Sequence, residues 1–161
     1  MSIYDSDGPD GIPNSGDDDG YVDALAVIHP GGGAESGANN IWSHRSRLNF
    51  SAGSPFVTDD SRPNGASILI DDYIIVPAER WDGSTDSLIE IGSCCHEFGH
   101  ILGLPDLYEQ DMSSYAIGTW CLMCFGCWGG DLNTPQKPVH LSAWCKIRLG
   151  WIDPIVVSGT E

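Results

Sequence analysis

Two histidines and a glutamate carry the strongest chemical signal in this sequence. His96 and His100 are four residues apart, so on a helix both imidazoles lie on one face and can bind a single ion. Zinc suits two imidazoles and a carboxylate, and three protein ligands leave a coordination position open to water, as catalytic sites require. Glu97 would then lie beside that water, which predicts a role as general base.

The residues after the second histidine predict a third metal ligand. Gly103 accepts a positive φ at little cost and Pro105 cannot continue a helix, so we expect a sharp turn there. That turn would bring Asp106 back toward the ion, with Glu109 and Asp111 as nearby competitors. The arrangement resembles the metzincin pattern H-E-x-x-H-x-x-G-x-x-H with Asp, an ordinary zinc ligand, in the last position.

A helix must position this site, and residues 87–102 have the required pattern. Apolar side chains recur there at spacings of three and four and predict a buried helix face, made of Leu88, Ile91, Cys95, Phe98 and Leu102. We expect the helix to start near residues 84–87, because Ser87 and Glu90 have the spacing of a capping box.

Segments further along the chain extend the resemblance to one family. Metzincins place a methionine turn beneath the metal, and residues 118–123 end in Met123 at a suitable distance. The motifs are residues 96–108, 118–123, 126–130, 140–144 and 149–151. Taken together, they resemble the M6 family of secreted bacterial metalloproteases, the immune inhibitor A type, over about residues 21–154.

The resemblance implies a fold, an activity and a set of site residues. The fold is α+β, a metzincin-like zinc protease domain with a mixed sheet, an active-site helix and an irregular C-terminal subdomain. The activity is that of an extracellular zinc endopeptidase acting on protein or peptide substrates. The implied roles are zinc ligation by His96, His100 and Asp106, general base catalysis by Glu97, and the turn methionine at Met123. The alternative is a catalytically incomplete module that binds zinc and calcium.

We expect one catalytic domain over residues 1–161. It would comprise an acidic loop (1–20), an upper subdomain with the active-site helix (21–104) and a lower subdomain with the methionine turn and a final helix (105–161, helix 138–149). Strands are expected at 22–29 and 67–77, the second interrupted at residues 71–72, with a glycine-rich loop at 30–40. The strand before the helix would offer its edge to a substrate peptide.

Composition limits the partners. The net charge of −16, with only seven Lys and Arg, disfavours nucleic acid and anionic membranes. No run approaches the roughly 18 apolar residues of a membrane helix. Residues 1–20 lack the basic start and apolar stretch of a secretory signal. The apolar content of 41% is enough for one core, and the oligomeric state stays open.

The N-terminal segment is rich in aspartate and glycine and has no basic residue to offset the charge. Carboxylates on such loops can surround calcium, which accepts irregular oxygen geometry, and a solvated acidic loop is the alternative. The candidate calcium ligands are Asp5, Asp7, Asp10, Asp17, Asp19 and Asp23, and Asp18 belongs to the same acidic run.

Six cysteines leave their chemistry open. Cys121, Cys124 and Cys127 form C-x-x-C-x-x-C around the methionine turn, and Cys94, Cys95 and Cys145 complete the set. Disulfides, reduced buried thiols and a metal are the alternatives. An iron–sulfur cluster is disfavoured, because the position expected to hold its fourth cysteine is Asp131.

Overall fold

The computed structural model describes residues 12, 19–62, 64–80, 87–109, 111 and 113–155. The chain divides into two compact units, Met1–Ile89 and Glu90–Glu161, called here the N-terminal and C-terminal units. The prediction of a single domain over 1–161 stays a prediction. The candidate calcium ligands Asp5, Asp7, Asp10 and Asp17 lie outside the described residues.

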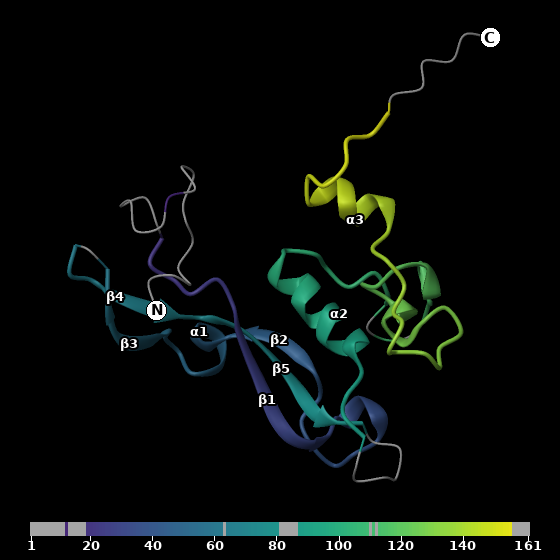
Figure 1. Cartoon of the computed structure of the whole chain (residues 1–161), viewed down its shortest axis with the longest axis horizontal. Helices are drawn as coiled ribbons and strands as arrows, with labels where there is room; N and C mark the ends of the chain where they lie inside the picture. The colour runs from purple at the N-terminus through teal and green to yellow at the C-terminus, as the bar shows by residue number, and fades with distance from the viewer. Residues whose placement is uncertain are drawn as a thin grey trace. The chain divides into compact units, whose positions relative to one another are not determined.

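A three-stranded sheet with the order β1-β5-β2 organises the N-terminal unit (Figure 1). Strand β1 (Leu25–Gly32) runs parallel to β5 (Asp72–Glu79), and β2 (His44–Arg47) runs antiparallel to β5. Since β5 is the central strand, the prediction that it offers a free edge to substrate is wrong. Its β-branched and aromatic residues suit this half-buried position, with Ile74 and Val76 buried.

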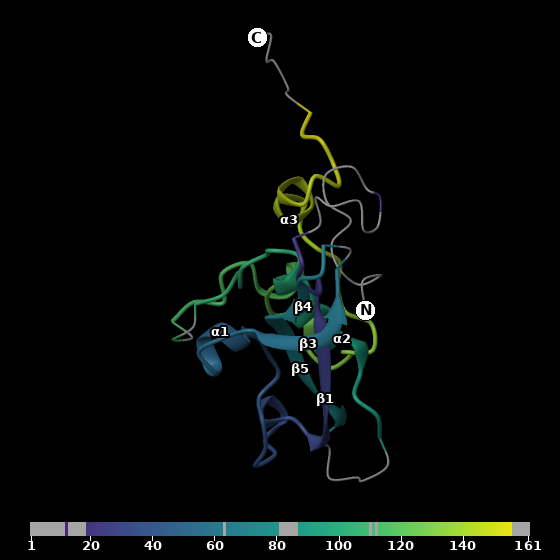
Figure 2. The ribbon, with the colours of Figure 1, turned by 90° about the vertical axis from the view of Figure 1, so that its left-hand side faces the viewer.

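A hairpin of β3 (Phe56–Ser61) and β4 (Ser67–Ile70) forms the second sheet of this unit (Figure 2). Asp71 separates β4 from β5, which confirms the predicted interruption. The predicted strand start at residue 22 is wrong, because the Val22 amide bonds to the Leu69 carbonyl of β4 (2.8 Å) instead of joining β1. The remaining elements are the 3-10 helix η2 (Ala34–Ser36) and the single-turn helix α1 (Leu48–Ser51).

Helices and turns make up the described part of the C-terminal unit. They are α2 (Ile91–Ile101), the 3-10 helices η3 (Gly118–Trp120) and η4 (Phe125–Trp128), and α3 (Ala143–Arg148). The core consists of Leu104, Cys121, Met123, Leu141 and Cys145. Together, the two units confirm a mixed α and β content, while the likeness to metzincins stays a prediction.

Helix α3 is shorter than predicted. It begins at Ala143 because Ser142 is its N-cap, with a side chain that accepts a hydrogen bond from the Cys145 amide. The residues before the cap are held elsewhere, since the Val139 amide bonds to the Gly126 carbonyl (2.9 Å). Among the described residues, no helix has the length and apolar character needed to cross a membrane.

Candidate metal centre

Helix α2 begins later than predicted. Glu90 is its N-cap and makes no side-chain cap bond, so the predicted capping box with Ser87 is wrong. The residues before Glu90 bond to β5 and its continuation instead: the Ser87 carbonyl accepts from the Arg80 amide (2.9 Å), and the Ile89 amide donates to the Ala78 carbonyl (3.1 Å). Strand pairing therefore holds the segment in which the cap was expected.

The buried face of α2 is its glycine and histidine face. Gly92, His96, Glu97 and Gly99 are buried, whereas the predicted apolar face is largely exposed: Leu88 80%, Ile91 56%, Phe98 47% and Leu102 41%. The prediction of a buried apolar stripe is therefore wrong. The glycines explain the difference, because a Cβ at Gly92 would lie 1.9 Å from the Cys127 carbonyl oxygen and one at Gly99 would lie 2.3 Å from the Met123 sulfur. Absence of side chains lets the methionine turn approach this face closely.

The turn after α2 has the hydrogen bonds of a Schellman motif. Gly103 has a φ of +86° and donates to the His100 carbonyl (3.0 Å), and the Leu104 amide donates to the Gly99 carbonyl (3.1 Å). The predicted sharp turn at Gly103 is thus confirmed. It reverses the chain and brings Asp106 back to the helix.

Three ligand atoms converge at this turn. The Asp106 Oδ1 atom lies 3.0 Å from His96 Nε2 and 3.2 Å from His100 Nε2. One ligand atom from each residue falls within 4.8 Å of the other two. Zinc bonds of about 2.0 Å at tetrahedral angles would separate two ligand atoms by about 3.3 Å. This separation is close to the distances of 3.0 Å and 3.2 Å between Asp106 Oδ1 and the two Nε2 atoms.

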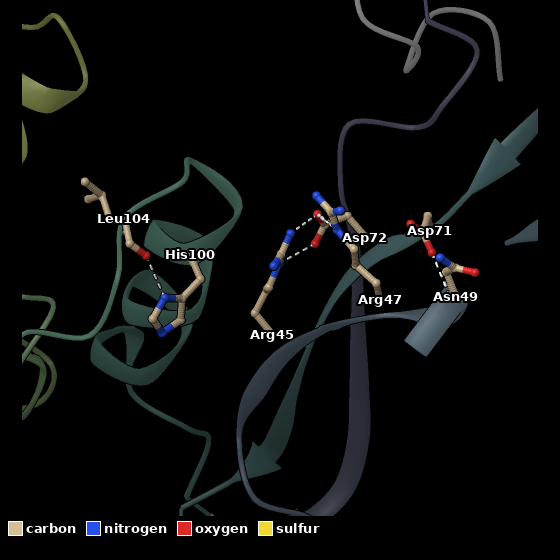
Figure 3. A network of polar contacts seen from close by, with 7 residues as sticks. All are labelled: Arg45, Arg47, Asn49, Asp71, Asp72, His100 and Leu104. Carbon is tan, nitrogen blue, oxygen red and sulfur yellow. Dashed lines mark hydrogen bonds and ion pairs between the residues drawn. The ribbon is translucent and has the colours of Figure 1, made fainter. Parts of the chain in front are cut away.

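Backbone carbonyls fix which ring nitrogens face the centre. The His96 Nδ1 atom lies 2.9 Å from the Leu122 carbonyl oxygen, and the His100 Nδ1 atom lies 2.8 Å from the Leu104 carbonyl oxygen (Figure 3). Each Nδ1 must donate its proton to its carbonyl, so a neutral imidazole presents the lone pair of Nε2 to Asp106. Two lone pairs and a carboxylate oxygen are all acceptors. Because each of these three atoms offers an electron pair, together they fit a metal cation.

In the metal-free chain, protons balance these acceptors. Burial lowers the pKa of His96, but hydrogen bonds to Asp106, to the Cys127 sulfur and to a backbone carbonyl outweigh burial and raise that pKa to about 10. Burial also lowers the pKa of His100, and its bonds to Asp106 and to a carbonyl raise it overall. Burial raises the pKa of Asp106, whereas the bonds from the histidines hold it well below the usual range.

Glu97, Met123 and Tyr108 are three further side chains in this part of the C-terminal unit. Glu97 is buried on α2 directly after the first histidine, and Met123 is fully buried against Gly99. The Tyr108 ring stacks on His96 with centroids 6.3 Å apart. Burial raises the pKa of Tyr108, and so do the charge of Asp106 and the hydrogen bond that its carboxylate accepts from the tyrosine hydroxyl. That bond gives Asp106 a partner other than the histidines.

Other predicted ligands are not part of this group. Glu109 and Asp111, the competitors for the third position, are both exposed. Of the candidate calcium ligands, Asp19 and Asp23 are described, and the Asp19 carboxylate accepts from the Tyr21 amide (2.8 Å). The group of His96, His100 and Asp106 is the one set of three metal-ligating side chains found within the described ranges, and it includes no cysteine.

A cavity of about 490 Å³ adjoins the third ligand. Its lining is mostly apolar and comes from the C-terminal unit: Asp106, Leu107, Tyr108, Glu109, Ala116, Ile117, Ser142 and Trp144. Asp106 links this cavity to the group of three ligand residues, whereas His96 and His100 are not part of its lining.

Several contributors to the site were not found from the sequence. The Leu122 and Leu104 carbonyls leave no residue-type signal, since any residue has a carbonyl. Gly99, within the H-E-F-G-H motif, was a detectable signal: a glycine inside a helix costs stability and indicates a close approach. Tyr108 ends the motif of residues 96–108, but its contact with Asp106 depends on the turn and is not predictable from spacing.

A helix with two histidines four residues apart, a glutamate between them and a carboxylate from the following turn defines the metallopeptidase class of site. The family model for the catalytic domain of immune inhibitor A peptidase M6 matches residues 1–152. Immune inhibitor A from Bacillus thuringiensis subsp. alesti is 35% identical over 141 residues. The pre-pro-metalloprotease PrtV from Vibrio cholerae serotype O1 (strain ATCC 39315 / El Tor Inaba N16961) is 31% identical over 148 residues. The chain therefore belongs to the M6 peptidase family of metalloproteases.

These similarities cover most of the chain but little of the relatives. The match to immune inhibitor A includes 79% of this chain and 19% of that protein, and the match to PrtV includes 84% of this chain and 15% of that protein. The chain thus corresponds to less than a fifth of each relative's length, within the part that the family model describes as the catalytic domain.

Proposed function

We propose that this chain is the catalytic part of a zinc-dependent endopeptidase. His96, His100 and Asp106 would hold the zinc ion, and Glu97 would be the general base. The observation that carries the proposal is the convergence of two imidazole nitrogens and a carboxylate oxygen, each within 4.8 Å of the others. Membership of the M6 family supports the same conclusion.

Bound zinc supplies Lewis-acid chemistry, lowering the pKa of a coordinated water toward neutrality and polarising a peptide carbonyl. Glu97 accepts the proton of the attacking water and then donates it to the leaving amine nitrogen. Its position next to His96 on α2 supports this role, because neighbouring helix residues share a rigid backbone. Burial of Glu97 (7% exposed) shields the proton transfer from bulk water.

The rest of the site positions these groups. The Leu122 and Leu104 carbonyls hold the imidazoles of His96 and His100 in the tautomer that ligates metal. Tyr108 donates to Asp106 and keeps its carboxylate oriented. Substrates would be proteins or peptides, with the apolar cavity beside Asp106 available to a side chain near the cleaved bond. The extracellular setting remains part of the proposal by family resemblance. Calcium at the acidic N-terminal segment, of which Asp19 and Asp23 are described, remains a proposal that rests on the carboxylate chemistry of that segment.

The test is metal-dependent proteolysis by the purified chain. Casein cleavage should stop when a chelator removes the metal and return when zinc is added to one equivalent. The variant His96→Ala should stay inactive after the same addition, since it lacks a ligand. Cleavage that persists in chelator, or that His96→Ala retains, would exclude the proposed site. A parent chain that binds one zinc without cleaving casein or peptides would favour the catalytically incomplete module.

A further inference from the structure

Two buried sulfur atoms lie close together outside the metal centre. Cys121 Sγ and Cys145 Sγ are 3.7 Å apart, and both residues are fully buried (0% exposed) in the core of the C-terminal unit. Both are thiols in the structure. A disulfide has an S–S bond of about 2.05 Å, so the two sulfurs need to approach by less than about 2 Å to form one.

The backbone around this pair is well fixed. Ser142, the N-cap of α3, donates from its amide to the Cys121 sulfur (3.3 Å) and from its hydroxyl to the Cys145 sulfur (3.3 Å). The Leu122 amide donates to the His140 carbonyl (3.3 Å). This bond joins the residue that follows Cys121 to the segment that precedes Cys145. The fold thus holds both sulfurs in one place.

The other cysteines have different surroundings. The Cys124 thiol donates to the Tyr115 carbonyl (3.4 Å), the Cys127 sulfur interacts with His96, and Cys94 and Cys95 are half-buried on α2. A metal on the cysteines is not supported in the described part of the chain, where the one group of three ligand atoms contains none of them. An S–S bond is the chemistry that best suits a buried pair of sulfur atoms 3.7 Å apart.

We propose that Cys121 and Cys145 form a disulfide that ties the methionine turn to α3. The two thiols lose two protons and two electrons, and a low-molecular-weight disulfide such as oxidised glutathione accepts them and becomes two thiols. The S–S bond forms between the two Sγ atoms. An oxidising compartment would provide such an acceptor, and the cysteines are 24 residues apart, a loop long enough for its closure to stabilise the fold.

The bridge acts next to the metal centre. Cys121 directly precedes Leu122, whose carbonyl accepts the Nδ1 proton of His96. A covalent tie at Cys121 therefore restrains the carbonyl that orients a proposed metal ligand. The expected consequences are a higher melting temperature and slower loss of zinc from the oxidised chain, whether or not the chain cleaves peptides.

The experiment maps the thiols of the full chain. The chain is first incubated with oxidised glutathione, and it is then denatured and alkylated without reductant. Chymotrypsin is the suitable protease, because it cuts after Trp120, Phe125, Trp128 and Trp144 and separates Cys145 from the other cysteines. Four alkylated cysteines and a cross-linked peptide pair containing residues 121 and 145 are expected. The variant Cys124→Ser, the matched control, should keep the cross-link and thereby assign it to Cys121.

Thermal unfolding provides the second readout. A reductant should lower the melting temperature of the oxidised parent and of Cys124→Ser by about 10 °C, but leave that of the double variant Cys121→Ser/Cys145→Ser unchanged. Six alkylated cysteines, or a bridge between any other pair, would overturn the proposal. The mapping uses the parent chain, so it decides the question even if the double variant does not fold.

Discussion

Two aspartates, one in each unit, meet nitrogen-bearing side chains in opposite ways, and Figure 3 shows the first of them, Asp72, with Arg45 and Arg47. In the N-terminal unit, Asp72 accepts from Arg45 through both carboxylate oxygens and from Arg47 Nε at 3.3 Å. Guanidinium groups always carry their protons, so this cluster has donors for its acceptors within the chain. The Asp72 cluster therefore needs no added ion to balance its carboxylate.

In the Asp106 cluster of the C-terminal unit, the three ligand groups have no donor for one another once the imidazoles are neutral. Each Nδ1 proton of His96 and His100 is used on a backbone carbonyl, which leaves two nitrogen lone pairs facing a carboxylate oxygen. Protons or a metal cation must balance this excess of acceptors. The direction of the hydrogen bonds, more than the types of residue, therefore separates a candidate metal centre from a structural ion pair.

The largest effect is expected from a change beside the Asp106 cluster that leaves its ligand atoms intact. Glu97→Gln keeps the size of the side chain but removes the proton acceptor, so the cleavage rate should fall about 10²- to 10⁴-fold. Zinc content, measured by elemental analysis, should stay near one per chain. A variant that cleaves at the parent rate would contradict the role of Glu97 as general base.

The two aspartates can be compared directly by the same substitution. Asp106→Asn should weaken zinc binding at least about 10-fold, because a neutral amide replaces an anionic ligand. Asp72→Asn, the matched control, should leave zinc affinity unchanged, and it should cost about 1–3 kcal/mol of stability because it weakens hydrogen bonds between charged groups. Calorimetric titration with zinc measures both. Equal losses of affinity in the two variants would remove the distinction between the clusters.

A smaller effect is expected from the glycine that brings the methionine turn to α2. Gly99→Ala places a Cβ 2.3 Å from the Met123 sulfur, so one of them must shift, at a cost of about 1–3 kcal/mol. Gly130→Ala is the control, because its nearest neighbour is 3.8 Å away, an ordinary contact. Denaturant unfolding of the two variants measures the difference. A Gly99→Ala variant as stable as Gly130→Ala would show that the contact is not restrictive.

The smallest effect is a difference in pH dependence between the metal-free and zinc-bound chains. The pKa of His96 is raised from its usual 6.5 to about 10 in the folded chain, so protonation contributes stability that is complete below pH 6.5 and is lost as the pH rises toward 10. Zinc binds the unprotonated imidazole, so its affinity should increase over the same range.

Melting temperatures measured in chelator should therefore fall from pH 6.5 to 9 in the parent chain and change less in His96→Ala. Melting temperatures measured with zinc should show a weaker fall, or a rise, over that range. A metal-free parent chain whose melting temperature rises from pH 6.5 to 9 would contradict the assigned proton.

The turn of the candidate site was predictable because its signals are local. The spacing of His96 and His100 acts within one helical turn, and Gly103 determines where the chain reverses. The buried face of α2 was not predictable from apolar periodicity, since Gly92 and Gly99 bury their side of the helix by admitting neighbouring backbone and sulfur. Periodicity measures side-chain hydrophobicity and does not register contacts made possible by the absence of a side chain.

Features that depend on distant segments were also missed. Strand β5 is recognisable from its β-branched residues, but its central place results from pairing with β1 and β2. The start of α3 depends on Ser142 and on bonds between residues 126 and 139. The carbonyl partner of His96 lies 26 positions further along the chain, at Leu122. Such contacts are set by tertiary structure, so composition and spacing alone do not predict them.

The central claim is that His96, His100 and Asp106 bind one zinc ion. Anomalous diffraction at the zinc absorption edge, from crystals of the zinc-loaded chain, tests it most directly. We expect one strong peak about 2.0–2.2 Å from Nε2 of each histidine and from a carboxylate oxygen of Asp106. A peak held instead by Glu109, Asp111 or cysteine sulfurs, or no peak at these histidines, would contradict it.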